Sequence, residues 1–389
     1  ANGGAYGFYM KFNADETLSM YSDWDNNAAV TGKNSTYSIR YIMNTSLIFD
    51  TYNYITIMQD PQSSVNGGSQ PNGLQSDIEF EYLRSTEDTV VLRGRKYRNY
   101  LYLLKANANE ASAYANGSFL TTINQFKNYF LTKSNNYVSL NYGGAPIKMG
   151  IVFDNNRKTV EVQGKLAEGK FGSDKQGFAF SIDGGFFINP IAFADKNFVA
   201  IKLKDANTLV LIDDKGVEYP ILQNPVPLTE LYEIFGSGSG KTYNSIYLIN
   251  GQRPAGVTSA FNSVYDGVIS RFQGTSRVVD TLEIRLSNSN TALVRLWYLS
   301  GTSRFLADAS FNYTLEADGT LTFSNYTPAA SNGNWNTRIA QIGNLVAWLQ
   351  SGPFKIDWVA SSIPGAPNYG GLYRKADPGD FYYGYLRKI

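Results

Sequence analysis

The sequence of 389 residues contains neither cysteine nor histidine. Without cysteine the chain forms no disulfide and offers no thiol nucleophile. Without either residue type it builds no zinc site of the usual kind and no triad in which histidine activates serine. These absences exclude several large classes of enzyme and leave chemistry that relies on carboxylates, hydroxyls and aromatic rings.

The sequence also lacks an excess of either charge. Lys and Arg number 34 and Asp and Glu number 33, for a net charge of +1, which argues against a nucleic acid partner. No run approaches the roughly 18 apolar residues of a membrane-spanning helix. Aromatic residues make up 14% and glycine is frequent, a composition typical of an exported, strand-rich protein with polar outer faces.

The length predicts two or three domains at roughly 150 residues each. Short alternating segments predict a mainly β fold with a few interspersed helices. We expect tandem β-barrel-like modules of the lipocalin kind, or sandwiches, since periodicity does not separate the two. The expected modules are 1–135, an N-terminal β module closed by a helix, 136–225, a second β module, and 226–389, a C-terminal α+β module.

Apolar residues spaced by three and four predict the helices. One is expected to begin at Ser118 as its N-cap, and others to cover 227–235, 258–273 and 336–350. The pattern Ala-Asp-x-Thr-Leu occurs at 14–18 and again at 317–321, each time between two expected strands. This echo indicates either a repeated β module or a turn that hairpins commonly share.

Three segments resemble chemical motifs without matching them. Residues 236–242 (GSGSGKT) are similar to a phosphate loop, but Phe235 stands where that loop needs glycine, so we interpret the segment as a linker. Asp77, Glu79 and Glu81 share one strand face that suits a metal, a sugar or solvent. The basic tract 93–98 suits phosphate, an anionic sugar or an exposed turn. We predict no catalytic residue, metal or cofactor, with a carboxylate-based hydrolase as a less favoured alternative.

Aromatic residues beside amides and carboxylates are the strongest candidates for ligand contact, because such groups hold sugar rings by stacking and hydrogen bonding. Trp24, Tyr52 and Trp335 stand in such surroundings in expected loops, with core packing as the alternative. Asp50 and Asn53 flank Tyr52, although a role in tying a turn is favoured for them. The candidate ligand-binding residues are Trp24, Asp50, Tyr52, Asn53 and Trp335.

Several segments of the first hundred residues carry a family resemblance. They are Gly7–Phe12 before the Asp15 turn, Ser35–Ile39 before Leu47–Asn53, Asp77–Phe80, and Leu92–Lys96. Their order and spacing resemble a family of Bacteroidetes lipoproteins known as domain-of-unknown-function family 4302. The approach to Asp77, Gln75-Ser76, departs from the glycines expected there.

The family has no established activity, so the resemblance implies a location rather than a reaction. It implies export, a lipid anchor on a leader cysteine that this sequence lacks, and exposure at the outer membrane or cell surface. The start Ala1-Asn2-Gly3-Gly4 is what we expect after removal of a leader. We therefore expect a non-catalytic envelope protein that binds glycan or peptide nutrients, with an outer-membrane uptake complex as partner. The alternative is a structural or assembly subunit, or a surface adhesin.

Overall fold

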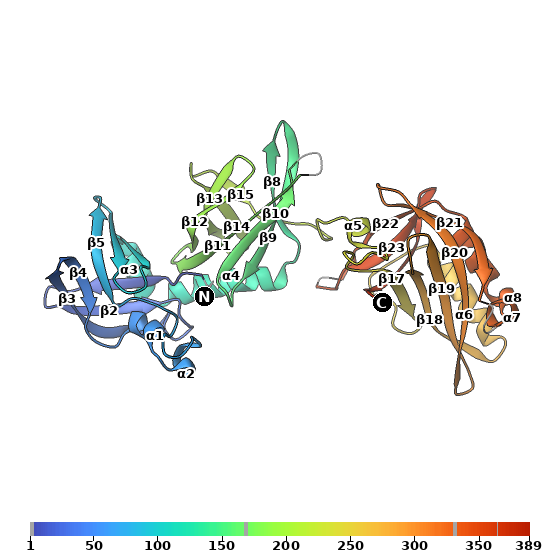
Figure 1. Ribbon diagram of the computed structural model, residues 1–389, viewed down its shortest axis with the longest axis horizontal. Helices are drawn as coiled ribbons and strands as arrows, with labels where there is room; N and C mark the ends of the chain where they lie inside the picture. The colour runs from blue at the N-terminus through green and yellow to red at the C-terminus, as the bar shows by residue number, and fades with distance from the viewer. Residues whose placement is uncertain (1–3, 167–169, 330–332, 364) are drawn as a thin grey trace. The chain divides into compact units, whose positions relative to one another are not determined.

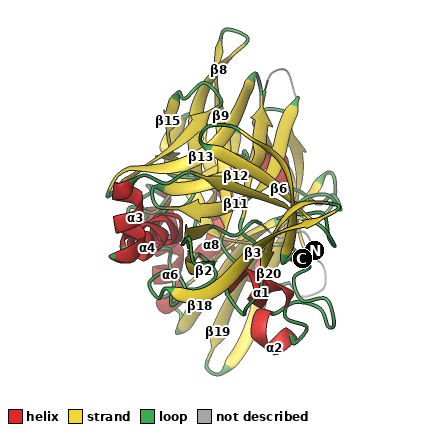
Figure 2. Cartoon of the chain, turned by 90° about the vertical axis from the view of Figure 1, so that its left-hand side faces the viewer, coloured by secondary structure: helices red, strands yellow, loops and turns green. Residues whose placement is uncertain are grey.

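The computed structural model describes residues 4–166, 170–329, 333–363 and 365–389. Residues 1–3, where the expected mature start falls, lie outside these ranges. The chain is mainly β with few helices, as predicted (Figure 2), and divides into two compact units, Ala1–Gln223 and Asn224–Ile389. No helix within the described ranges is long and apolar enough to cross a membrane.

The first unit begins with a seven-stranded antiparallel sheet whose strands follow one another in sequence order (Figure 1). They are β1 (Phe8–Phe12), β2 (Thr17–Ser22), β3 (Lys33–Ile42), β4 (Asn44–Phe49), β5 (Glu79–Ser85), β6 (Thr89–Gly94) and β7 (Tyr100–Leu104), with helices α1 (Tyr54–Gln59) and α2 (Ser63–Asn66) between β4 and β5. Side chains alternate between the two faces of a strand. Leu47, Phe80 and Leu92 lie on one face of the sheet and form part of a buried core. The opposite face can therefore carry polar side chains.

A second, nine-stranded antiparallel sheet nearly closes into a barrel. After helices α3 (Ala108–Ala115) and α4 (Ser118–Thr132) come β8 (Asn136–Tyr142), β9 (Ala145–Asp154), β10 (Thr159–Lys165), β11 (Phe171–Ser181), β12 (Gly184–Phe193), β13 (Lys196–Asp205), β14 (Thr208–Asp213), β15 (Glu218–Pro220) and β16 (Leu222–Gln223). Only Ile221 separates β15 from β16, yet β15 pairs with β14 and β16 with β8. This short segment therefore brings the end of the sheet back to its beginning.

Helix α4 packs with the second sheet rather than the first. Its apolar stripe is buried, as the spacing predicts, and the ring of Phe126 lies 5.4 Å from that of Phe180 on β11. We expected this helix to close the first module, but its buried residues belong to the core of the second sheet. The predicted cap is also wrong, because Gly117, with a φ of 85°, is the N-cap and Ser118 is the first helical residue.

The second unit is a closed barrel of eight antiparallel strands. Its elements are α5 (Leu231–Ile234), β17 (Ser245–Ile249), α6 (Phe261–Gln273), β18 (Arg277–Leu286), β19 (Thr291–Ser300), β20 (Ser303–Leu315), β21 (Thr320–Pro328), α7 (Asn334–Thr337), α8 (Ile339–Gln350), β22 (Phe354–Val359), β23 (Tyr369–Arg374) and β24 (Asp377–Arg387). The helices predicted at 258–273 and 336–350 are present as α6 and as α7 with α8. The one predicted at 227–235 shrinks to the single turn of α5.

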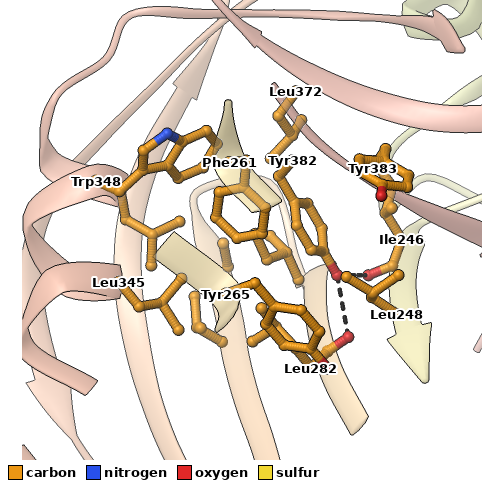
Figure 3. Packing of buried hydrophobic residues seen from close by; sticks show 14 of the residues in the cluster. Ile246, Leu248, Phe261, Tyr265, Leu282, Leu345, Trp348, Leu372, Tyr382 and Tyr383 are labelled. Atoms are coloured by element: carbon orange, nitrogen blue, oxygen red, sulfur yellow. Dashed lines mark hydrogen bonds between the residues drawn. The ribbon is translucent and has the colours of Figure 1, made fainter. Parts of the chain in front are cut away.

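Aromatic and aliphatic side chains fill the inside of this barrel (Figure 3). The ring of Phe261 on α6 lies 4.7 Å from Trp348 on α8 and 5.3 Å from Tyr382 on β24. The Tyr382 hydroxyl lies 2.9 and 3.0 Å from the carbonyl oxygens of Ile246 and Leu282. Burial of these rings stabilises the barrel, and it occupies the space that eight-stranded barrels of the lipocalin kind can offer to a ligand.

The repeated pattern Ala-Asp-x-Thr-Leu forms similar turns in two hairpins. Between β1 and β2, Asp15 Oδ1 accepts hydrogen bonds from the hydroxyl and the backbone N–H of Thr17, at 2.6 and 3.1 Å. Between β20 and β21, Asp318 Oδ1 accepts one from the N–H of Thr320 at 2.9 Å. Threonine hydrogen bonds lower the pKa of both carboxyls. A shared turn chemistry therefore accounts for the echo at the level of the hairpin.

A buried ion pair joins the two sheets of the first unit. The Asp23 carboxylate, which follows β2, has no exposed surface and lies 2.5 Å from Lys158 Nζ in the turn before β10. It also accepts hydrogen bonds from the N–H groups of Gly7 and Phe180, at 2.9 and 2.8 Å. Burial lowers the pKa of Lys158, and Asp23 opposes that shift. A side chain at Gly7 would place its Cβ 1.9 Å from the Phe180 carbonyl oxygen, so the approach requires glycine.

We predict that Asp23→Ala lowers the free energy of unfolding of the first unit by about 3–5 kcal/mol, because it leaves the Lys158 ammonium buried without its carboxylate. The measurement is hydrogen exchange of the β11 amides as a function of urea concentration. Glu218→Ala is the matched control, since its pair with Lys204 is 2.8 Å long but exposed and should matter little. Equal effects of the two changes would contradict this role of Asp23.

Candidate ligand-binding face

The prediction that Trp335 is an exposed aromatic is wrong. Its side chain has no exposed surface and lies in α7, with its ring 6.4 Å from those of Phe311 and Tyr326. The surrounding asparagines and glycine suggest a loop, but the indole packs into the core of the C-terminal barrel. Trp335 therefore has no face on which a ligand could stack.

Trp24 is half-buried and packs against the core of the seven-stranded sheet. Its ring lies 5.4 Å from that of Tyr6, at an angle of 41°. Tyr6 in turn lies beneath Lys158, whose Nζ is 4.5 Å from the ring centroid. These contacts place Trp24 beside the buried ion pair of Asp23 and Lys158, where it helps to join the two sheets.

The segment around Asp50 mainly holds structure together, the role that the sequence favours. Asn53 is fully buried and caps α1, accepting hydrogen bonds from the N–H groups of Ile55 and Thr56 at 2.9 and 3.1 Å. Asp50 is exposed and accepts a hydrogen bond from the hydroxyl of Ser38 at 3.1 Å. An asparagine cap satisfies the first amides of a helix, so this asparagine is committed to the fold.

Tyr52 has half of its surface exposed. Its hydroxyl donates to Asp60 Oδ2 at 2.9 Å, and Lys33 Nζ lies 4.7 Å from its ring centroid. A cation already covers one face of this ring, so Tyr52 is less available for stacking than a bare tyrosine. The structure thus keeps Asp50, Tyr52 and Asn53 in one short segment, while Trp24 packs on the core of the same sheet.

Two hollows on the described surface are open to solvent. One of about 460 Å³ is lined by Ser139, Leu140, Asn141, Pro146, Lys196 and Tyr219. The other, of about 450 Å³, is lined by Asn13, Thr17, Leu18, Asn34, Ser35 and Thr36. Both are shallow and mix polar with apolar atoms, whereas small-molecule sites are usually concave and enclose most of their ligand. An extended ligand on a flat face suits this molecule better than a small one in a pocket.

The outer face of the seven-stranded sheet offers such a surface. The strand register places Arg40, Ser46, Glu81, Arg93 and Tyr100 in one row across β3 to β7. A parallel row contains Arg84, Val91 and Tyr102. We call this surface the tyrosine–arginine face; its members are Arg40, Ser46, Glu81, Arg84, Val91, Arg93, Arg98, Tyr100 and Tyr102. Ser46, Glu81 and Val91 are buried between the exposed members.

Tyr100 and Tyr102 form an exposed aromatic pair on β7. Their rings are stacked, with centroids 6.0 Å apart and an angle of 23° between the planes. The two side chains are 56% and 50% exposed. Exposing the apolar part of a tyrosine ring to water is unfavourable compared with burying it in a core. β7 is an edge strand that pairs only with β6, so the rings stand at the rim of the sheet, open to a long ligand.

Beside this pair, Glu81 fixes two arginines. Its Oε1 lies 2.6 Å from Arg93 and 3.1 Å from Arg98, and its Oε2 accepts a hydrogen bond from Asn44 at 3.3 Å. The hydrogen bond from Arg93 is the main cause that lowers the pKa of Glu81. The carboxylate is therefore ionised at neutral pH and holds both guanidinium groups next to the tyrosines.

The buried carboxylate of Asp77 shapes the loop that presents Arg98. It accepts hydrogen bonds from the N–H groups of Lys96, Tyr97 and Asn99 at 2.8, 2.8 and 3.2 Å, and from the Asn99 side chain at 3.1 Å. A Cβ on Gly94 would lie 2.0 Å from the Asp77 carboxyl carbon. Asp77 can therefore reach the loop only because position 94 is glycine.

The three acids on the predicted strand face, Asp77, Glu79 and Glu81, do not act together. Asp77 turns into the loop, Glu79 lies 3.7 Å from Arg95, and Glu81 binds the other arginines. Within the described ranges, no three acidic side chains gather in a way that could hold a metal ion. Of the basic tract 93–98, Arg93 and Gly94 end β6 and residues 95–98 lie in the loop to β7, in line with its interpretation as a turn between strands. Arg93 lies opposite Tyr100 in the strand register.

The sequence analysis overlooked Tyr100 and Tyr102. The available signal is that tyrosine alternates with leucine in Tyr100-Leu101-Tyr102-Leu103. Every residue of this segment is apolar or aromatic, so no polar residue marks the outer face. Such a segment shows the strand but not which set of side chains faces the core. The register decides it, because Leu101 and Leu103 pack on the core and the tyrosines face outward.

The fold and this face together define a mainly β protein with barrel-like modules and an exposed aromatic and cationic surface. Residues 1–205 match the model of the family described as Domain of unknown function (DUF4302), and the chain belongs to this family. The match ends with the last residue of β13 and includes the whole tyrosine–arginine face. No curated protein matches the chain. The residues that carry the resemblance include Asp77 and Gly94, which build the loop of the face.

We predict that Glu81 titrates below its ordinary pKa of 4.5 and that Arg93→Gln raises this pKa. Because the folded-state pKa is the lower one, the stabilisation by Arg93 is present above the ordinary value and is lost as pH falls through the folded-state value. A carboxyl-carbon NMR titration measures the shift. Arg304→Gln, in the other unit, should leave it unchanged, and an unaltered Glu81 pKa in Arg93→Gln would refute the pairing.

Proposed function

We propose that this chain is a non-catalytic binding protein that holds a glycan on the tyrosine–arginine face. The stacked, exposed pair of Tyr100 and Tyr102 is the observation that carries the proposal. Aromatic rings offer apolar contact to the C–H groups of sugar rings. The arginines beside them supply N–H donors for sugar hydroxyls. Both elements of sugar recognition thus stand on one rigid sheet.

Two further features support an extended ligand. The aromatic pair lies on an edge strand, where a chain can pass without meeting another strand. The inside of the C-terminal barrel is filled, so that barrel offers little volume to a small molecule. An extended peptide is the other ligand to consider, because an edge strand can pair with one through its backbone. The exposed rings of Tyr100 and Tyr102 favour a glycan, because they can contact sugar rings.

Location belongs to the same proposal. Export, a lipid anchor on a preceding cysteine, exposure at the outer membrane or cell surface, and a place in a nutrient-uptake complex rest on the resemblance to Bacteroidetes lipoproteins. The aromatic-rich composition, which is typical of a strand-rich protein with polar outer faces, supports export.

A second candidate function is that of an accessory subunit. The hairpin between β3 and β4 exposes Tyr41 and Met43, at 81% and 83%. Apolar groups this exposed are typical of protein interaction sites when they lie together. Tyr41 pairs with Thr45 across the hairpin and alternates with Arg40, so it lies on the side opposite the tyrosine–arginine face. The two candidate functions therefore use different surfaces of one sheet.

We predict that Tyr100→Ala and Tyr102→Ala each weaken glycan affinity by about tenfold, which corresponds to roughly 1.4 kcal/mol. Both rings are half exposed, so the melting temperature should hardly change. The ligand would first be found by screening the full chain on host, dietary and microbial glycans, with a parallel set of peptides. Titration calorimetry would then compare the variants.

Tyr41→Ala is the matched control, since it removes an exposed tyrosine from the opposite face of the same sheet. It should leave glycan affinity unchanged. A folded protein that binds no glycan, or one whose affinity survives both changes on β7, would contradict the proposal. Loss of a membrane partner in Tyr41→Ala would instead favour the accessory role.

A further inference from the structure

Positive charge dominates the tyrosine–arginine face although the whole chain is nearly neutral. Four of its members are arginines and one is a glutamate. The buried carboxylate of Asp77, held by the loop that carries Arg98, adds a second anion, so cations exceed anions by two. The neighbouring pair of Arg95 and Glu79 adds no net charge.

The arginines differ in how much of their charge is already used. Arg93 and Arg98 both contact the same oxygen of Glu81, so two guanidinium groups share one carboxylate. Arg98 has a side chain that is 52% exposed. Arg84 is exposed and makes no ion pair within the described ranges. The face thus keeps guanidinium N–H groups that can meet an anion from solvent.

Two of these cations lie in the same rows of side chains as the aromatic pair. Arg93 lies directly opposite Tyr100 across β6 and β7. Arg84 and Tyr102 are both cross-strand neighbours of Val91, one on each side of it. Each tyrosine therefore has an arginine in its own row. A ligand that stacks on the rings brings its substituents over the guanidinium groups.

We infer that the glycan bound on this face is acidic, carrying carboxylate or sulfate groups on its sugar rings. This inference rests on the proposed function and names its ligand class. A guanidinium group matches a planar carboxylate or a sulfate through paired N–H donors, while the tyrosines take the ring. A neutral glycan would leave the excess positive charge of the face without a partner.

The acidic side chains of this region offset only part of that charge. Glu81 and Glu79 are already engaged by arginine. Glu87 and Asp88 lie in the turn between β5 and β6, beyond the last residue of β5 and therefore at the end of the face away from Arg93. That end is the one nearer Arg84 and Tyr102, so a ligand that enters from the Tyr100 end of β7 meets Arg93 and Arg98 first.

The experiment measures binding of the full chain to three probes by titration calorimetry. They are an oligogalacturonate, the same oligomer as its methyl ester, and a sulfated oligosaccharide of similar length. The two acidic probes distinguish carboxylate from sulfate. We expect at least one of them to bind about tenfold or more tightly than the neutral ester, and its affinity to fall as salt is added.

The variants Arg84→Gln and Arg98→Gln should each reduce that preference, because they lower affinity for the acidic probe more than affinity for the neutral ester. Arg157→Gln is the matched control, because it removes an exposed arginine from the second sheet and should have no effect. Both variants change exposed side chains, so folding should be retained. If one of them fails to fold, the salt dependence of the wild-type chain still tests the inference.

The outcomes separate the two claims. Equal binding of the acidic and neutral oligomers, with loss of both in Tyr100→Ala, would overturn the acidic ligand and leave the glycan-binding function standing. Absence of binding to every glycan, acidic or neutral, would overturn both. An acidic preference that persists in Arg84→Gln and Arg98→Gln would show that the charge acts from another surface and would also overturn the inference.

Discussion

The hydrogen-bonded carboxylate of Asp77 is the interaction on which the candidate tyrosine–arginine face depends. It is buried, and four N–H donors from the loop after β6 satisfy its oxygens. A buried charge is tolerated only when it is hydrogen bonded in this way, so the loop and the carboxylate fix each other. Gly94 makes the approach sterically possible. The loop in turn sets Arg98 beside Glu81, and with them the cationic border of the tyrosine pair.

The filled C-terminal barrel gives the second constraint. Helices α6 and α8 send Phe261, Tyr265 and Trp348 into its core, where they meet the inward side chains of the strands. A barrel packed in this way gains stability from aromatic burial and has little interior left for a ligand. The recognition that we propose therefore uses the outer face of a sheet, where rows of side chains are set by strand register. The seven-stranded sheet uses this arrangement, because its single core leaves the other face to the row from Arg40 to Tyr100.

Sequence reasoning reached the fold class and the longer helices, because their apolar periodicity is strong. It missed α1, whose cap Asn53 was interpreted as a turn, and α3, which buries only Tyr114 and so shows no stripe. The capping box of Asn107 and Glu110 was the available signal for α3. For the site, the basic tract was found but its partners were not, since Glu81 and Tyr100 meet Arg93 only through register. Trp335 failed as a candidate because polar neighbours in the sequence do not show whether the tryptophan itself is buried.

The location of the bound ligand is the most direct test of the account. Hydroxyl-radical footprinting of the full chain with and without a saturating glycan would report every exposed tyrosine at once. The account predicts that Tyr100 and Tyr102 lose reactivity on binding, while Tyr41 on the opposite face and Tyr142 on β8 keep theirs. Protection of Tyr142 or of residues in the C-terminal unit, with Tyr100 and Tyr102 unchanged, would contradict it.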